Sequence, residues 1–85
     1  MSYKTILSKN SVLTTKLLDY LADNPDAAIH IPSGVSYVVF SAKDEKLNEY
    51  NLKLVKQLKS NGKKVVKAIE TKNKQAPWEL NYLSA

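Results

Sequence analysis

Two β-branched segments flank one amphipathic segment, and this arrangement constrains the fold more than any other feature of the chain. Residues 35–40 and 65–71 each predict a strand, and residues 44–61 between them predict a helix. Strand, helix and strand with short connections form a βαβ unit, whose crossover is almost always right-handed. We therefore expect the two strands to lie side by side and parallel in one sheet.

The first predicted strand is apolar on both of its faces. Tyr37 and Val39 alternate with Val38 and Phe40 along residues 35–40. Strands that are buried on both faces are typical of sheets covered by helices on both sides. We therefore expect this strand to be central in the sheet.

The predicted helix over residues 44–61 carries a complete core-facing stripe. Its members recur at helical spacing and are Leu47, Tyr50, Asn51, Leu54, Val55 and Leu58. Ser41 with Asp44 resembles a capping box at the start, and Asn61-Gly62 predicts a left-handed stop at the end. One face of this helix should pack on the sheet.

A second amphipathic segment precedes the βαβ unit. It predicts a helix that begins within residues 3–11 and ends at Asn24, because the residue before Pro25 is pushed out of the helical region. Its core-facing stripe is Ile6, Asn10, Leu13, Leu17, Tyr20 and Leu21. Asp19 and Asp23 lie near the negative end of this helix dipole, and the sequence names no partner for either.

The remaining segments complete a single α/β domain over residues 1–85, of order α-β-α-β(-β). Residues 26–31 fit either a short strand or an irregular lead-in, and Ile31-Pro32-Ser33-Gly34 predicts a β-turn. Residues 72–85 contain a polar loop followed by alternating apolar and polar residues. This alternation predicts either an antiparallel third strand or a tail that seeks an apolar surface.

The charge of the chain gives only weak support to nucleic-acid binding. The net charge is +5, but all 13 basic residues are lysine, and the bidentate recognition of bases and phosphates is a property of arginine. We favour a solvated surface. A lysine-based nucleic-acid-binding protein is the alternative, and its contacts would be Lys43, Lys63, Lys64, Lys72 and Lys74.

Composition also bears on cofactors and location. The chain has no cysteine and a single histidine, His30, which leaves little from which to build a metal site, so we expect no metal and no cofactor. We see neither a signal-peptide pattern nor an apolar segment of membrane-spanning length. We therefore expect a cytoplasmic protein with no membrane partner.

The βαβ geometry gathers polar residues at one edge of the sheet. Lys43 and Asp44 follow the first strand, and Lys72 and Lys74 follow the second. Ligands of open α/β sheets bind at such an edge, and lysines beside helix-end amides attract anions. However, Asp44 and Glu45 already supply negative charge there, so we favour a capped helix start with solvated lysines over an anion site.

Two asparagines interrupt the apolar stripes of the predicted helices. Asn10 and Asn51 would each carry an amide into the core, where an unpaired polar group costs roughly 1–3 kcal/mol. We expect them to bond each other, a loop carbonyl or a buried water. A ligand-binding amide and a polar position at a subunit interface are the alternatives.

The C-terminal segment is the predicted interface. Trp78, Leu80 and Tyr82 belong either to the core or to a contact surface, since a sheet of two or three strands leaves edges that proteins cover or pair. Two-fold dimers are the commonest solution. The leading hypothesis is a non-catalytic, self-associating protein-interaction module that regulates or stabilises a partner; we do not expect an enzyme.

The order of motifs resembles a small uncharacterised prokaryotic family, a domain of unknown function. The matching pieces are Asn10 to Leu17, Tyr20-Leu21 with Pro25, Ile31-Pro32-Ser33-Gly34, Val38-Val39-Phe40, Asp44 to Leu54 with its Asn-Leu-x-Leu core, and Gly62 to Val66. The resemblance implies the same order of elements and no known chemistry. The resemblance also implies a gene neighbourhood of toxin–antitoxin or mobile-element genes.

Overall fold

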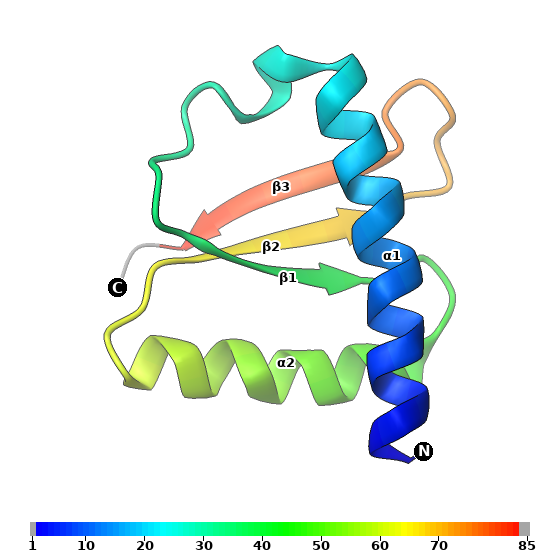
Figure 1. Cartoon of the computed structure of the whole chain (residues 1–85), viewed down its shortest axis with the longest axis vertical. Helices are drawn as coiled ribbons and strands as arrows, with labels where there is room; N and C mark the ends of the chain where they lie inside the picture. The colour runs from blue at the N-terminus through cyan, green and yellow to red at the C-terminus, as the bar shows by residue number, and fades with distance from the viewer. Residues whose placement is uncertain (1, 84–85) are drawn as a thin grey trace.

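The computed structural model describes residues 2–83 as two helices, one 3-10 turn and a three-stranded sheet (Figure 1). In chain order, the elements are α1 (Tyr3–Asp23), η1 (Pro25–Ala28), β1 (Ser36–Phe40), α2 (Glu45–Ser60), β2 (Val65–Glu70) and β3 (Trp78–Leu83). The predicted α/β domain with an additional N-terminal helix is confirmed. The open alternative at the C-terminus is resolved in favour of a strand.

The sheet is mixed, with the strand order β1-β2-β3. β1 runs parallel to β2 with Val39 opposite Ala68, and β3 runs antiparallel to β2 with Leu80 opposite Ala68. The parallel pairing of the βαβ unit is thus confirmed. The prediction that residues 35–40 form the central strand is wrong, because β1 lies at an edge and β2 is central.

The apolar pattern of β1 reflects coverage of its faces and carries no information about its edges. Val39 belongs to a core cluster with Leu13 and Leu17 of α1, whereas Val38 and Phe40 belong to a second cluster with Val55 of α2. α1 therefore covers the Val39 face of β1, where Leu47 of α2 joins the cluster, and α2 covers the opposite face. A strand at the edge of a sheet becomes apolar on both faces when helices cover both sides.

The two helices differ in how they meet the sheet (Figure 1). α1 crosses one face and packs on all three strands through its cluster, which includes Val39, Ala68 and Trp78. α2 runs alongside β1 and contacts β1 and β2. Tyr50, which we expected in the core stripe of α2, is 40% exposed, so that part of the prediction is wrong.

Hydrogen bonds at the helix ends fix where α2 begins and stops. Asp44 is the N-cap, and its side chain accepts from the backbone N–H of Leu47 at 3.1 Å, whereas Ser41 bonds amides within the preceding loop. The sequence predicts that Asp44 lies within the helix. Asp44 instead caps it, and the helix begins at Glu45. At the other end, Gly62 takes a φ of +76°, which forms the predicted left-handed stop.

The connection between α1 and β1 is irregular. Residues 26–31 form no strand, and the 3-10 helix Pro25–Ala28 occupies the start of the segment instead. The turn that leads into β1 is centred on Ser33 and Gly34, with Gly34 at a φ of +79°. Of the two alternatives from the sequence, the irregular lead-in is therefore the correct one.

Candidate functional site

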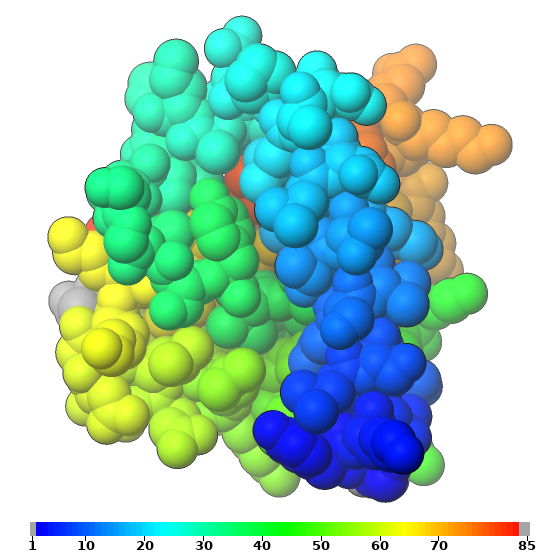
Figure 2. All heavy atoms as spheres, viewed as in Figure 1, coloured from blue at the N-terminus to red at the C-terminus, as the bar shows by residue number. Residues whose placement is uncertain are grey.

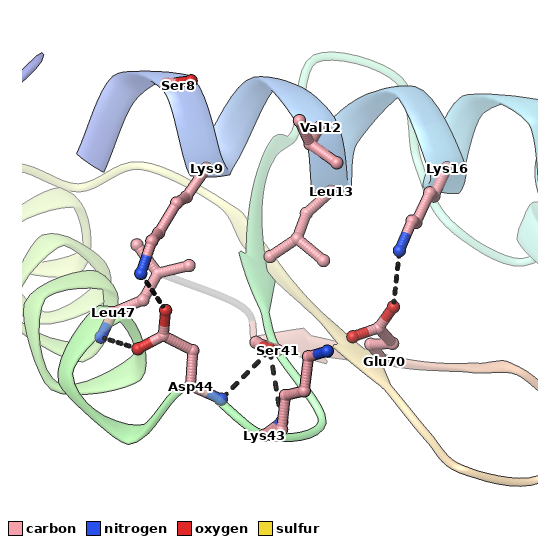
Figure 3. Close-up of a pocket in the computed structure, with 10 residues that line it drawn as sticks. All are labelled: Ser8, Lys9, Val12, Leu13, Lys16, Ser41, Lys43, Asp44, Leu47 and Glu70. Carbon is pink, nitrogen blue, oxygen red and sulfur yellow. Dashed lines mark hydrogen bonds and ion pairs between the residues drawn. The ribbon is translucent and has the colours of Figure 1, made fainter. Parts of the chain in front are cut away.

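An open cavity of about 370 Å³ lies at the carboxyl edge of β1 and β2, beneath α1 (Figure 3). This is the edge at which the sequence places the ends of both parallel strands. The lining comes from α1 (Ser8, Lys9, Val12, Leu13 and Lys16), from the β1–α2 loop (Ser41, Lys43 and Asp44) and from Leu47 and Glu70.

Two ion pairs frame this cavity. The ammonium of Lys9 lies 2.6 Å from the carboxylate of Asp44, and that of Lys16 lies 3.7 Å from the carboxylate of Glu70. The two lysines lie two turns apart on one flank of α1, and Figure 3 shows them reaching down at either side of Leu13. Both pairs are partly exposed, so they position α1 over the edge more than they stabilise the fold.

Asp44 is the acidic residue of the site whose pKa is shifted. The ammonium of Lys9 donates a hydrogen bond to its carboxylate, and the backbone N–H of Leu47 donates another. These two bonds, the first above all, hold the pKa of Asp44 below its ordinary value of 3.8. The carboxylate is therefore ionised at neutral pH and acts as a fixed charge, with no proton to exchange in that range.

The backbone amides of residues 41–44, which could cradle an anion, are all occupied by side chains. Ser41 N–H donates to Asn48 Oδ1 (2.7 Å), Ala42 N–H to Glu70 Oε1 (3.1 Å), and the N–H groups of Lys43 and Asp44 both donate to Ser41 Oγ (3.2 and 3.1 Å). The carboxylate of Glu70 thus already holds one position that a bound anion would take. This arrangement agrees with the capped helix start favoured from the sequence.

The five lysines named from the sequence do not come together. Lys43 lines the cavity, and Lys72 and Lys74 lie in the β2–β3 loop outside its lining. Lys63 and Lys64 precede β2 at the opposite end of the sheet (Figure 1). A single basic surface made of these five residues is therefore absent, which weakens the nucleic-acid alternative.

Lys9 and Lys16 are the charged residues of the cavity that the sequence reasoning missed. Each lies on α1 next to the core stripe, at positions a helix plot places on one flank. That spacing was visible in the sequence. What the sequence did not reveal is that this flank faces the carboxyl edge of the sheet.

Asn10 and Asn51 bond each other away from the cavity. Asn51 is completely buried, and its amide nitrogen donates to Asn10 Oδ1 and to the carbonyl of Val39, each at 2.8 Å. Asn10 Nδ2 returns a bond to Asn51 Oδ1 at 3.2 Å. These contacts engage both amides within the chain, as expected from the sequence.

The predicted interface residues lie on the face of the sheet that α1 covers. Trp78 is 8% exposed and part of the α1 core cluster, and Leu80 packs against that cluster. Tyr82 alone of the three presents a large surface, at 39% exposure. This placement favours the core interpretation for Trp78 and Leu80.

Further exposed apolar side chains lie on α1. Figure 2 shows α1 as an uncovered ridge on the face towards the viewer. Along it, Leu7, Val12 and Leu18 are 50%, 55% and 60% exposed. In the part of the chain from residue 2 to 83, no group of three histidine, cysteine or acidic residues could hold a metal ion, and no helix is long and apolar enough to span a bilayer.

Comparison with known proteins identifies the family and nothing closer. A family model described as "Family of unknown function (DUF5647)" matches residues 5–77. No curated protein and no solved structure matches the chain. The resemblance to an uncharacterised family that the motifs suggest is thereby confirmed.

Proposed function

The chain belongs to the family of unknown function DUF5647, and we propose that it is a non-catalytic interaction module that self-associates through α1. The observation that carries this proposal is the exposure of Leu7 and Leu18 on one flank of the outer face of α1 and of Val12 on the opposite flank, which also borders the cavity. The cavity described above is framed by two ion pairs, and its lining residues include no nucleophile in contact with a base. It therefore offers no comparable support for catalysis.

The outer face of α1 is short of charge. Between Lys4 and Asp19 it presents Ser8, Ser11 and Thr15, which are small and uncharged. The two lysines in the middle of the helix, Lys9 and Lys16, turn to the cavity. A helix that meets only water usually carries charged residues on its outer face, so this composition suits a partner surface.

Charge complementarity supports a second copy of the chain, antiparallel to the first, as the partner. Lys4 lies at the start of the outer face of α1 and Asp19 near its end, and neither makes an ion pair within the described residues. In an antiparallel pair, Lys4 of each copy would face Asp19 of the other. Asp19 lies unfavourably near the negative end of the α1 dipole, and the last turn of α1 has no basic residue. The antiparallel arrangement would place the Lys4 ammonium of the second copy beside this carboxylate.

The antiparallel register that pairs Lys4 with Asp19 would also bring the exposed apolar side chains of the two copies together. Its two-fold axis would lie beside Ser11 and Val12. Helical spacing places Leu7 and Leu18 on one flank of the outer face, so Leu7 of each copy would pack on Leu18 of the other. Val12 would meet Val12 of the second copy near the axis. One helix pair buries less than the roughly 800 Å² per partner of a standard interface, so we expect a dimer of micromolar or weaker affinity.

Sedimentation velocity over a wide concentration range tests the proposal. The expected result is a concentration-dependent rise from 9.5 kDa to twice that mass. L18E should leave a monomer. K4E should weaken association, and the double variant K4E/D19K should restore it, because the charge pair is then reversed and intact.

I29E is the matched control. Ile29 is 67% exposed, comparable with Leu18, but lies outside α1 at the end of η1. This variant should dimerise as the unmodified chain does. A chain that stays monomeric at millimolar concentration, or a dimer that persists in L18E, would overturn the proposal.

A further inference from the structure

One side chain of the cavity has a charge that the chain does not neutralise. Lys9 pairs with Asp44 and Lys16 with Glu70. The ammonium of Lys43, which also lines the cavity, makes no ion pair or hydrogen bond within residues 2–83. The uncompensated charge of the site is therefore positive, and it favours an anionic group.

The carboxylates of the site cannot serve a cation equally well. Asp44 accepts from Lys9 and from the N–H of Leu47. Glu70 accepts from the N–H of Ala42 and lies beside Lys16. A cationic ligand would have to displace one of these lysines, whereas an anionic group can approach Lys43 without breaking a bond.

The cavity also offers an apolar wall. Val12, Leu13 and Leu47 contribute to its lining between the two ion pairs, and Figure 3 shows Val12 and Leu13 projecting from α1 toward the loop. Ser41 accepts two hydrogen bonds through Oγ, so its own hydroxyl hydrogen can still be donated. The volume of about 370 Å³ falls within the range of small-molecule sites, roughly 300–1,000 Å³.

We propose that this cavity binds a small organic anion that has an apolar body and one acidic group. The apolar body would lie against Val12, Leu13 and Leu47, and the acidic group would lie at Lys43 within reach of the Ser41 hydroxyl. Val12 borders both this site and the proposed dimer contact, so binding is tested on the monomer, where self-association through the outer face of α1 plays no part. The geometry differs from a phosphate cradle, because the amides of residues 41–44 keep their own acceptors.

The probe for the first experiment is 8-anilinonaphthalene-1-sulfonate, which joins an aromatic body to one sulfonate. Its fluorescence is titrated at a protein concentration low enough to keep the chain monomeric. Removing the ammonium in K43Q should weaken binding about threefold, the size expected for an exposed charge contact. N-phenyl-1-naphthylamine, which lacks the sulfonate, should bind the native chain and K43Q alike.

Two variants control for charge and for the other apolar surface. K63Q removes a lysine at the far end of the sheet, and L18E removes the most exposed leucine of α1; both should bind the sulfonate as the native chain does. Backbone amide shifts in ¹H–¹⁵N spectra should move at residues 41–44, Lys9 and Lys16. Equal affinity of K43Q and the native chain for the sulfonate, or amide shifts confined to the outer face of α1, would overturn the proposed binding site. Circular dichroism verifies that each variant is folded.

Discussion

Asn10 and Asn51 exchange two amide hydrogen bonds, at 3.2 and 2.8 Å, across the contact between α1 and α2. The amide of Asn51 also bonds the carbonyl of Val39 in the edge strand β1. The three elements α1, β1 and α2 are therefore joined at one point. Every buried side-chain nitrogen and oxygen in residues 2–83 has a partner, so this polar contact fixes register without leaving an unpaired group.

Truncating Asn51 should destabilise the fold strongly. N51A removes three hydrogen bonds and leaves the buried carbonyl of Val39 without that donor. We expect the free energy of unfolding to fall by about 1–3 kcal/mol, measured by urea denaturation. N10A should cost less, because Asn10 is only half-buried and water can reach the broken bonds.

The two asparagines should not behave additively. In N10A/N51A the loss should be smaller than the sum of the two single losses, since both single variants break the same pair of bonds. A coupling energy indistinguishable from zero would show that the amides do not depend on each other.

Acid should remove the contribution of Asp44. Its pKa in the folded chain is depressed below 3.8 by Lys9 and by the N–H of Leu47, so its contribution to stability is present above the unfolded pKa and lost as the pH falls through the folded pKa. D44N should therefore be less stable than the native chain at neutral pH, and the difference should shrink below pH 3.8. Urea denaturation of D44N and of the native chain at a series of pH values measures this difference in the free energy of unfolding.

The cause of this pH dependence can be tested separately. In a K9M background, the same Asp44 substitution should show a weaker pH dependence, because Lys9 is the largest cause of the depressed pKa. An unchanged dependence would assign the effect to the remaining causes, chiefly the backbone N–H of Leu47 and then the charge of Lys46.

Gly62 should resist replacement by alanine. Its φ of +76° lies in the left-handed region, which costs an L-residue about 1–2 kcal/mol, although no atom lies within 4 Å of an added Cβ. G62A should lower the free energy of unfolding by about that amount. G62N should lose less, because asparagine tolerates this conformation, and a neutral G62A would contradict the strain argument.

Lys67 should stabilise the chain through an aromatic ring. Its ammonium lies 4.9 Å from the centre of the Phe40 ring on the neighbouring strand. K67Q should cost about 0.5–1 kcal/mol in thermal or urea unfolding. K56Q, which replaces an exposed lysine of α2, serves as the control and should be close to neutral.

The fold was predictable where one periodicity dominates a segment. α2, β2 and the parallel βαβ unit follow from patterns within or between neighbouring segments. The position of β1 at the edge does not follow, because burial on two faces can come from helices as well as from strands. Residues 26–31 were ambiguous because the segment has neither a clean helical nor a clean strand period, and their 3-10 turn follows from local bonding after Pro25.

The site was predictable only in part. The convergence of Lys43 and Asp44 at the carboxyl edge follows from the βαβ topology. The contributions of Lys9 and Lys16 depend on the angle at which α1 crosses the sheet, and no local pattern encodes that angle. The same holds for the core position of Trp78, since an alternating segment shows which residues share a face without showing what covers it.

The bond from Ala42 N–H to Glu70 has a consequence for how the chain folds. It joins the loop after β1 to the last residue of β2, 28 positions later, just as Asn10 reaches Asn51 across 41 positions. A truncated peptide that stops before β2 would lack the acceptor for that amide and could not complete its own loop. We therefore expect the segment before β2 and the segment from β2 onward to unfold together in a single transition. Neither segment should persist as an independent folding unit.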